Sequence, residues 1–132
     1  MGIALLDTSI VIAALNRHDV LHQPASRAVL AERGRHPLAI SALTYAEILV
    51  GPLRTGQEAV DVVERFAAQT RILEVSASVA RLAAELRATR NLKLPDAVIV
   101  ATGLRHEADM ILTCDARWKG IETVRVVGTG DR

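Results

Sequence analysis

The chain has 132 residues, of which 50% are hydrophobic and 23% are charged, with 16 basic residues against 15 acidic ones. This length suits one domain, so we expect a single domain over residues 1–132, and the composition excludes a disordered chain. Only Tyr45, Phe66 and Trp118 are aromatic, which excludes a base-stacking platform for single-stranded nucleic acid. The net charge of +1 argues against a protein that coats DNA or membranes non-specifically.

The single cysteine, Cys114, excludes an intrachain disulfide and a cysteine zinc cluster, and it favours a reducing compartment. The first residues carry no basic leader, and no apolar run approaches the roughly 18 residues that span a bilayer. We therefore expect a cytoplasmic protein with no membrane partner.

The first half of the chain predicts alternating strands and helices. A continuous apolar run over residues 3–6, ending at Asp7, indicates a buried parallel strand followed by a helix. A helix over 23–33 and a strand over 38–40 follow. Ser41 stands where a helix N-cap belongs, ahead of a helix that carries Glu47 and that Gly51 and Pro52 are expected to end. Residues 51–57 form the least constrained stretch.

The second half continues the alternation. A helix from position 56, a strand over 72–75 and a helix capped by Ser76 come first. Pro95 suits the first turn of a helix over about 96–106, which places Asp96 in that turn. Residues 110–113 predict a strand that ends before Asp115, and residues 123–127 predict the last strand. This order predicts a three-layer α/β/α fold with a central, mostly parallel sheet.

Four acids are expected to meet at the carboxyl ends of these strands, where open parallel sheets bind ligands. They are Asp7, Glu47, Asp96 and Asp115. Clustered carboxylates raise one another's pKa unless a cation compensates, and Mg²⁺ or Mn²⁺ takes such oxygen ligands. Simpler roles also fit each residue: an N-cap for Asp7 or Asp115, a partner of the helix dipole for Asp96, and an exposed helix edge for Glu47.

Four segments that carry these acids resemble the PIN-domain ribonucleases and, within them, the VapC toxins of prokaryotic toxin–antitoxin pairs. The resemblance covers nearly the whole chain. It implies a metal-dependent endoribonuclease whose four acids bind one or two Mg²⁺ or Mn²⁺ ions, and whose metal-activated water hydrolyses RNA. Thr8, Ser9 and Thr113 are candidates for orienting the carboxylates, although helix capping explains Thr8 and Ser9 equally well. The segments are residues 5–12, 41–51, 94–102 and 111–115.

The resemblance also implies partners. These are a VapB-type antitoxin that covers the active site, operator DNA reached only through that antitoxin, an RNA substrate and a second copy in a homodimer. With the four acids on metal, 16 basic residues face 11 acidic ones over the remaining surface. The candidates for RNA contact lie in predicted loops or at helix ends; they are Arg17, Arg54, Arg90, Lys93, Arg117 and Lys119.

Other functions fit the sequence less well. A non-enzymatic PIN domain, which mainly binds its antitoxin and regulates its operon with little cleavage, stays open. His18 and His22 have zinc-protease spacing, but that motif's Glu is absent and a loop is expected there. Cys114 has no base near it in the sequence, which favours a buried thiol over a nucleophile. Haloacid-dehalogenase-type phosphatases, which form an aspartyl phosphate, carry a second Asp two residues after the first, where this chain has Ser9.

Overall fold

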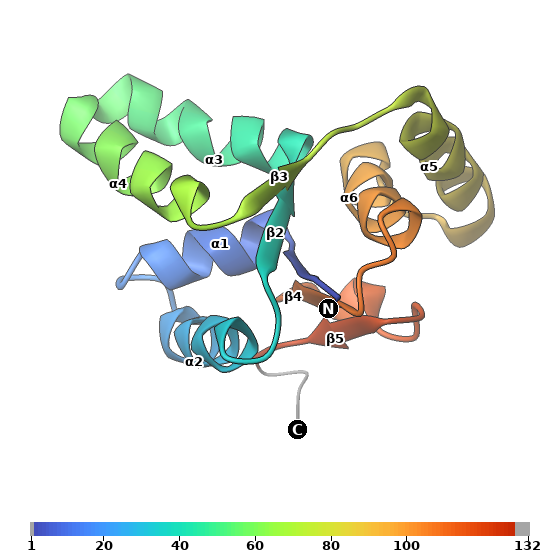
Figure 1. The fold of residues 1–132 in the computed structure, drawn as a ribbon, viewed down its shortest axis with the longest axis horizontal. Coiled ribbons are helices and arrows are strands. Elements are labelled where there is room, and N and C mark those ends of the chain that lie inside the picture. The colour runs from blue at the N-terminus through green and yellow to red at the C-terminus, as the bar shows by residue number, and fades with distance from the viewer. Residues whose placement is uncertain (1, 129–132) are drawn as a thin grey trace.

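The computed structural model describes residues 2–128, in which helices cover both faces of a central sheet (Figure 1). All five strands are parallel, in the order β3-β2-β1-β4-β5. The elements in chain order are β1 (Ala4–Leu6), α1 (Thr8–Leu15), α2 (His22–Arg33), β2 (Leu38–Ser41), α3 (Ala42–Thr55), α4 (Gln57–Ala68), β3 (Arg71–Leu73), α5 (Ala77–Arg90), α6 (Leu94–Arg105), β4 (Met110–Thr113), the 3₁₀ turn η1 (Ala116–Trp118) and β5 (Val124–Val126).

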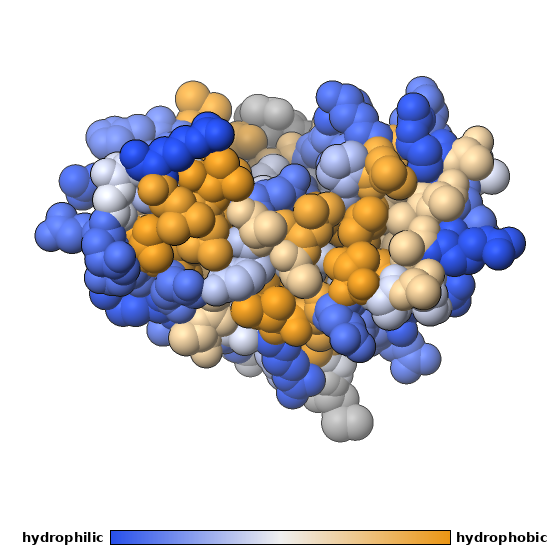
Figure 2. All heavy atoms as spheres, turned by 90° about the horizontal axis from the view of Figure 1, so that it is seen from above, coloured by the Kyte–Doolittle hydropathy of each residue, from blue (hydrophilic) through white to orange (hydrophobic). Residues whose placement is uncertain are grey.

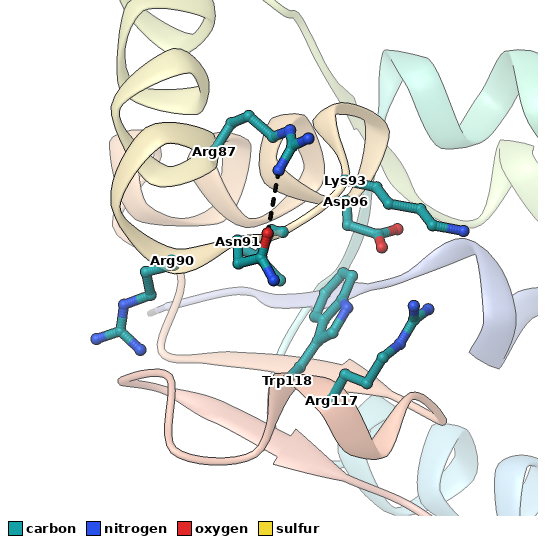
Figure 3. A pocket seen from close by; sticks show the side chains of 8 residues that line it. Arg87, Arg90, Asn91, Lys93, Asp96, Arg117 and Trp118 are labelled. Atoms are coloured by element: carbon teal, nitrogen blue, oxygen red, sulfur yellow. Dashed lines mark hydrogen bonds between the residues drawn. The ribbon is translucent and has the colours of Figure 1, made fainter.

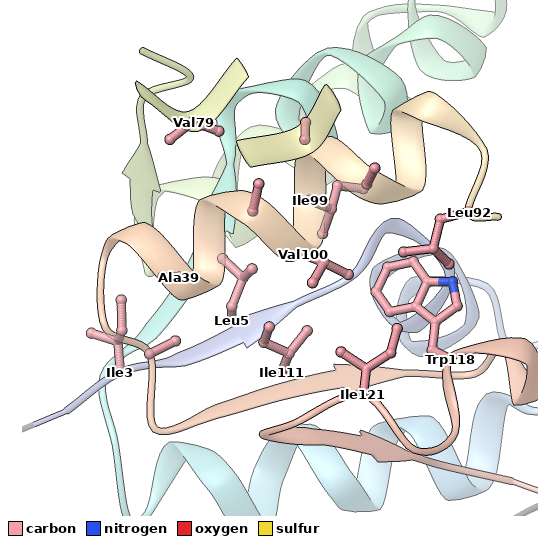
Figure 4. Close-up of a cluster of buried hydrophobic side chains, with 14 residues drawn as sticks. Ile3, Leu5, Ala39, Val79, Leu92, Ile99, Val100, Ile111, Trp118 and Ile121 are labelled. Carbon is pink, nitrogen blue, oxygen red and sulfur yellow. The ribbon is translucent and has the colours of Figure 1, made fainter. Parts of the chain in front are cut away.

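The central strand β1 divides the hydrophobic core in two, because its side chains alternate between the faces of the sheet. Leu5 packs on one face with residues of α5, α6 and η1, including Val100 and Trp118 (Figure 4). Ala4 and Leu6 pack on the other face with residues of α1, α2, α3 and α4. Both cores are sealed from water at β1, where all three side chains are fully buried. The predicted three-layer fold is confirmed, and its sheet is entirely parallel.

The predicted end of the third helix is wrong. α3 runs through Gly51 and Pro52 to Thr55 and ends at Gly56, whose φ of 153° belongs to the region that favours glycine. Proline removes its own N–H, but the Pro52 carbonyl still accepts the Gly56 N–H at 3.0 Å. Pro52 is half-buried and lines an apolar groove between α3 and the neighbouring helices α1 and α4. Tertiary packing therefore outweighs the local signal, and residues 51–57 are mostly helical.

Two predicted strands are longer than the observed ones. β3 ends at Leu73 because its partner Ser41 is the last residue of β2, so nothing remains for residues 74 and 75 to pair with. Thr123 lies outside β5 because its φ of 67° is left-handed. Within residues 2–128, no helix is long and apolar enough to cross a membrane.

Candidate functional site

Three neighbouring strands and the start of helix α6 bring the four acids to one edge of the sheet. Asp7 follows β1 directly, and Asp115 lies two residues beyond β4, which pairs with β1. Glu47 lies in the second turn of α3, which begins where β2 ends, and Asp96 lies in the first turn of α6. The predicted position of the acids at the carboxyl end of the sheet is thus observed.

Asp7 is a buried carboxylate, only 4% exposed. Its Oδ2 accepts hydrogen bonds from the hydroxyls of Ser9 and Thr113, both at 2.7 Å. Asp7 occupies the N-cap position of α1 but makes no side-chain cap hydrogen bond, so capping does not explain it. Burial raises its pKa above the ordinary value; the two hydroxyls oppose this shift, and the negative charge of Asp96 adds to it.

Glu47 is held by hydroxyls of its own neighbourhood. Thr8 donates to Glu47 Oε1 at 2.6 Å, and the Thr8 Oγ1 lies 3.0 Å from the Oγ1 of the fully buried Thr44. Thr8, Ser9 and Thr113 therefore contact the acids, as the sequence suggested. Thr44 is a further site residue that the sequence pattern does not predict, although it lies one helical turn before Glu47 in a stretch rich in apolar residues.

Asp96 links the four carboxylates electrostatically. Its pKa is raised, first by burial and then by the negative charges of Asp115 and Glu47, while the cations of Arg117 and Lys93 oppose the shift. Asp96 in turn raises the pKa of Asp7. The acids are therefore close enough to raise one another's pKa, which a bound cation would oppose.

Asp115 is already paired. Arg117 Nη2 donates to Asp115 Oδ2 at 2.6 Å, and Arg117 Nε donates to Oδ1 at 3.0 Å. Asp115 also caps η1, because its Oδ1 accepts the Arg117 backbone N–H at 2.9 Å. These contacts, led by the side-chain hydrogen bond, lower the Asp115 pKa. The capping role considered for Asp115 is therefore present, and the carboxylate is shared with an arginine.

The arrangement is suited to a hard cation without being a closed cage. Among residues 2–128, no three His, Cys, Asp or Glu side chains form a ready-made metal site. The donor set consists of carboxylates and hydroxyls, which suits Mg²⁺ or Mn²⁺ rather than zinc. Burial, and to a smaller extent the neighbouring negative charges, raise the pKa values of Asp7 and Asp96, and a divalent cation would favour their ionised forms. The residues present fit such an ion.

A polar cavity of about 450 Å³ adjoins the acids (Figure 3). Three of the six predicted RNA contacts line it: Arg90, Lys93 and Arg117. Arg17, Arg54 and Lys119 are not among its lining residues. Arg87 also lines it and was not singled out from the sequence, although it precedes Arg90 by one turn of the same helix.

A second, apolar groove of about 370 Å³ lies among α1, α3 and α4. Ile12 and Val62 line it and remain 45% and 44% exposed. Figure 2 shows hydrophobic side chains gathered on the end of the molecule that carries α3 and α4. Exposed apolar side chains gathered in a groove are typical of surfaces that bind other proteins.

The alternative chemistries gain no support from the structure. His18 lies in the turn between α1 and α2, whereas His22 Nδ1 lies 2.9 Å from the Ala13 carbonyl oxygen. Desolvation, with a smaller contribution from Asp7, raises the pKa of the Cys114 thiol to about 11. A protonated, partly buried thiol is a poor nucleophile.

Comparison with known proteins identifies the family. The PIN domain family model matches residues 4–123. A toxin–antitoxin complex from Klebsiella pneumoniae contains a chain of the same fold, with 29% identity and a TM-score of 0.77 over 93% of this chain and 96% of that one.

Two further solved structures share the fold at lower identity. VapBC2 from Rickettsia felis, bound to a DNA fragment from its promoter, has 19% identity and a TM-score of 0.78 over 96% of this chain and 99% of that one. Mycobacterium tuberculosis VapC20, a sarcin-ricin loop cleaving toxin, has 20% identity and a TM-score of 0.72 over 95% and 99%. Comparison with curated proteins found no match. With the family model spanning nearly all of its elements, the chain belongs to the PIN-domain family.

Proposed function

We propose that this protein is a VapC-type toxin, a Mg²⁺- or Mn²⁺-dependent endoribonuclease whose Asp7, Glu47, Asp96 and Asp115 hold one or two metal ions. The observation that supports the proposal is the position of these acids in a cluster at one end of the sheet, where they follow β1, β2 and β4 or begin α6. Such a cluster is unfavourable for folding, and functional sites are where proteins retain arrangements of this kind. Membership of the PIN family and the likeness to toxin structures support the same conclusion.

Hydroxyl side chains around the acids hold the carboxylates in fixed orientations. A bound divalent ion would acidify a water molecule and stabilise charge on the phosphodiester. Ser9 and Thr113 both donate to Asp7 Oδ2, which fixes the rotation of that carboxylate. Thr8 does the same for Glu47. These hydrogen bonds would keep ligand oxygens in place before an ion arrives, which lowers the cost of ordering them.

Cleavage of total RNA tests the activity. Purified protein is incubated with Mg²⁺ or Mn²⁺, beside samples with EDTA, an Asp7→Asn, Asp96→Asn double variant and Asp61→Asn, which changes an exposed acid of α4. We expect cleavage by the wild type and Asp61→Asn only. Cleavage that persists in EDTA or in the double variant would reject a metal nuclease at these acids.

The proposal includes partners: a VapB-type antitoxin, operator DNA reached through it, an RNA substrate and a second copy in a homodimer, all in the cytoplasm. The apolar groove with exposed Ile12 and Val62 supports protein contacts of this kind. The toxin–antitoxin structures of the same fold point the same way. Light scattering that gives the 14.2 kDa mass of one chain at all micromolar concentrations would reject the homodimer.

A second candidate is a PIN domain that mainly binds its antitoxin and regulates its operon with little cleavage. The Arg117–Asp115 pair favours it, because an arginine occupies one of the four proposed ligands. Calorimetric titration with Mn²⁺ separates the two functions. Binding to the wild type but not to the Asp7→Asn, Asp96→Asn variant supports the nuclease, and no binding to either supports the binding module.

A further inference from the structure

The cavity beside the acids carries an excess of positive charge. Arg87, Arg90, Lys93 and Arg117 line it, with Asp96 as the one acid among its lining residues. Asp96 also belongs to the four-acid cluster, so the cavity and the acid site share a wall. A group in the cavity would therefore lie directly beside a group bound at the acids.

One buried donor at this cavity lacks an acceptor. Trp118 is fully buried, and its Nε1 is one of two buried side-chain polar atoms without a hydrogen-bond partner among residues 2–128; the other is Glu32 Oε2 on α2. Buried polar groups are nearly always paired, because an unpaired one loses its hydrogen bonds to water. The Trp118 N–H thus indicates an acceptor that the folded chain does not itself supply.

The indole is oriented so that this donor faces the cavity. Figure 4 shows the six-membered ring of Trp118 turned towards the core, with the nitrogen on the opposite edge. Figure 3 shows the nitrogen on the edge that faces Lys93, Asp96 and Arg117. The ring belongs to the hydrophobic core, so its faces are not free for stacking, and the buried N–H on the edge towards the cavity is the one polar group that this side chain could offer to a ligand.

Two of the cations that line the cavity lie at the turn between α5 and α6. The side chains of Arg90 and Lys93 are exposed and make no hydrogen bond or ion pair with any other residue in the described part of the chain. They flank Asn91, whose left-handed conformation (φ 60°) ends α5 and turns the chain towards α6. The turn therefore brings two exposed cations to the rim of the cavity: Lys93 lies near enough to Asp96 to lower its pKa, and Arg90 is directed away from the indole nitrogen (Figure 3).

We propose that this cavity is a subsite for a second RNA phosphate, adjacent along the strand to the phosphate that the acids cleave. Trp118 Nε1 would donate to a phosphate oxygen, while Arg90 and Lys93 neutralise its charge. Phosphate is favoured over a nucleobase because Trp, Arg and Lys side chains are donors only and no aromatic face is available. The inference rests on the proposed ribonuclease function and names how that site holds its substrate.

The single tryptophan makes the subsite directly observable. The chain gives one indole N–H resonance, which is followed in EDTA while a six-nucleotide RNA or inorganic phosphate is added. We expect RNA to shift this resonance saturably. We expect Arg90→Ala, Lys93→Ala to bind the RNA at least tenfold more weakly, and to reduce the slope of log affinity against log salt by about 0.7, the value for one lost phosphate contact on a single strand.

Two further variants sharpen the test. Arg81 also lies on α5, but it pairs with Glu85 and does not line the cavity. The Arg81→Ala variant should therefore bind RNA like the wild type. Trp118→Phe keeps a ring but removes the N–H, and circular dichroism checks that it folds. Weaker RNA binding by folded Trp118→Phe supports the donor role, and unchanged binding contradicts it.

The outcomes separate this proposal from the proposed function. If RNA leaves the indole resonance unmoved, or if the double variant keeps wild-type affinity and salt slope, the subsite is rejected even when the protein cleaves RNA. A shift caused by inorganic phosphate alone, and not by RNA, also rejects it. If RNA binds as expected but the wild type cleaves no RNA with Mg²⁺ or Mn²⁺, the subsite stands and the nuclease proposal fails.

Discussion

Asp7→Asn should stabilise the metal-free protein while abolishing its activity. Asp7 is 4% exposed, and both burial and the charge of Asp96 raise its pKa. Asparagine has nearly the same shape, and its carbonyl oxygen can still accept from the Ser9 and Thr113 hydroxyls. The substitution therefore removes an unfavourable buried charge and keeps the two hydroxyl hydrogen bonds.

The expected gain is about 0.5–2 kcal/mol, the range that single stabilising changes commonly give. Unfolding entropy of about 2.1 cal/mol/K per residue gives about 280 cal/mol/K for 132 residues. One kcal/mol then corresponds to about 4 °C in Tm. We expect the Tm of Asp7→Asn in EDTA at neutral pH to exceed that of the wild type by about 2–7 °C.

The gain should depend on pH. The folded-state pKa of Asp7 is raised above its ordinary 3.8, so the folded wild type binds more protons than the unfolded chain in the interval above 3.8. Wild-type stability from this group is complete below 3.8 and is lost as pH rises through the raised value. The variant has no such group, so its advantage should vanish near pH 3.8 and be largest at neutral pH.

Scanning calorimetry of both proteins and of Asp61→Asn, across this pH range in EDTA and then with Mn²⁺, measures the effect. Asp61 is exposed, so its variant should stay within about 0.5 kcal/mol of the wild type. Mn²⁺ should raise the Tm of the wild type and of Asp61→Asn but not that of Asp7→Asn, because a ligand stabilises only the form that binds it. A lower Tm for Asp7→Asn in EDTA at neutral pH would refute the reasoning.

Three further outcomes are expected. Arg117→Ala frees the Asp115 carboxylate, so calorimetry should show tighter Mn²⁺ binding; weaker binding would mean that the arginine assists the site. Gly103→Ala would place its Cβ 2.6 Å from Ile111 Cδ1, and denaturant unfolding should show a loss of about 1–3 kcal/mol; an unchanged midpoint contradicts the tight packing of α6 on β4. Iodoacetamide at neutral pH should leave Cys114 and RNA cleavage intact, because its pKa is about 11; rapid labelling by mass spectrometry contradicts this.

The sequence predicts the layers of this fold because its signals are local. Apolar runs such as residues 3–6 correspond to β1, and Ser41 and Ser76 cap α3 and α5 through hydrogen bonds to nearby N–H groups. The predictions failed where distant packing decides. Pro52 stays within α3, where its carbonyl still accepts the Gly56 N–H, and β3 stops where β2 no longer offers a partner.

In the candidate site, too, the local sequence predicts the positions of the acids but not the contacts between distant residues. The order of strands and helices was enough to place the four acids at one sheet edge. The Thr8–Glu47 hydrogen bond joins residues 39 positions apart, and its geometry depends on how α1 packs against α3. The partnerless Trp118 N–H is likewise visible only in three dimensions, because a tryptophan in the sequence gives no sign of whether its nitrogen has an acceptor.

The sheet order affects how the protein can fold while it is being synthesised. β4 inserts beside β1, although the two strands lie far apart in the sequence and β1 is synthesised well before β4. Until Met110–Thr113 have left the ribosome, β1 lacks one neighbour and Asp7 lacks the Thr113 hydroxyl. Pairings of such long sequence separation form late. The acid cluster is therefore a property of the finished chain, and an incomplete nascent chain does not contain it.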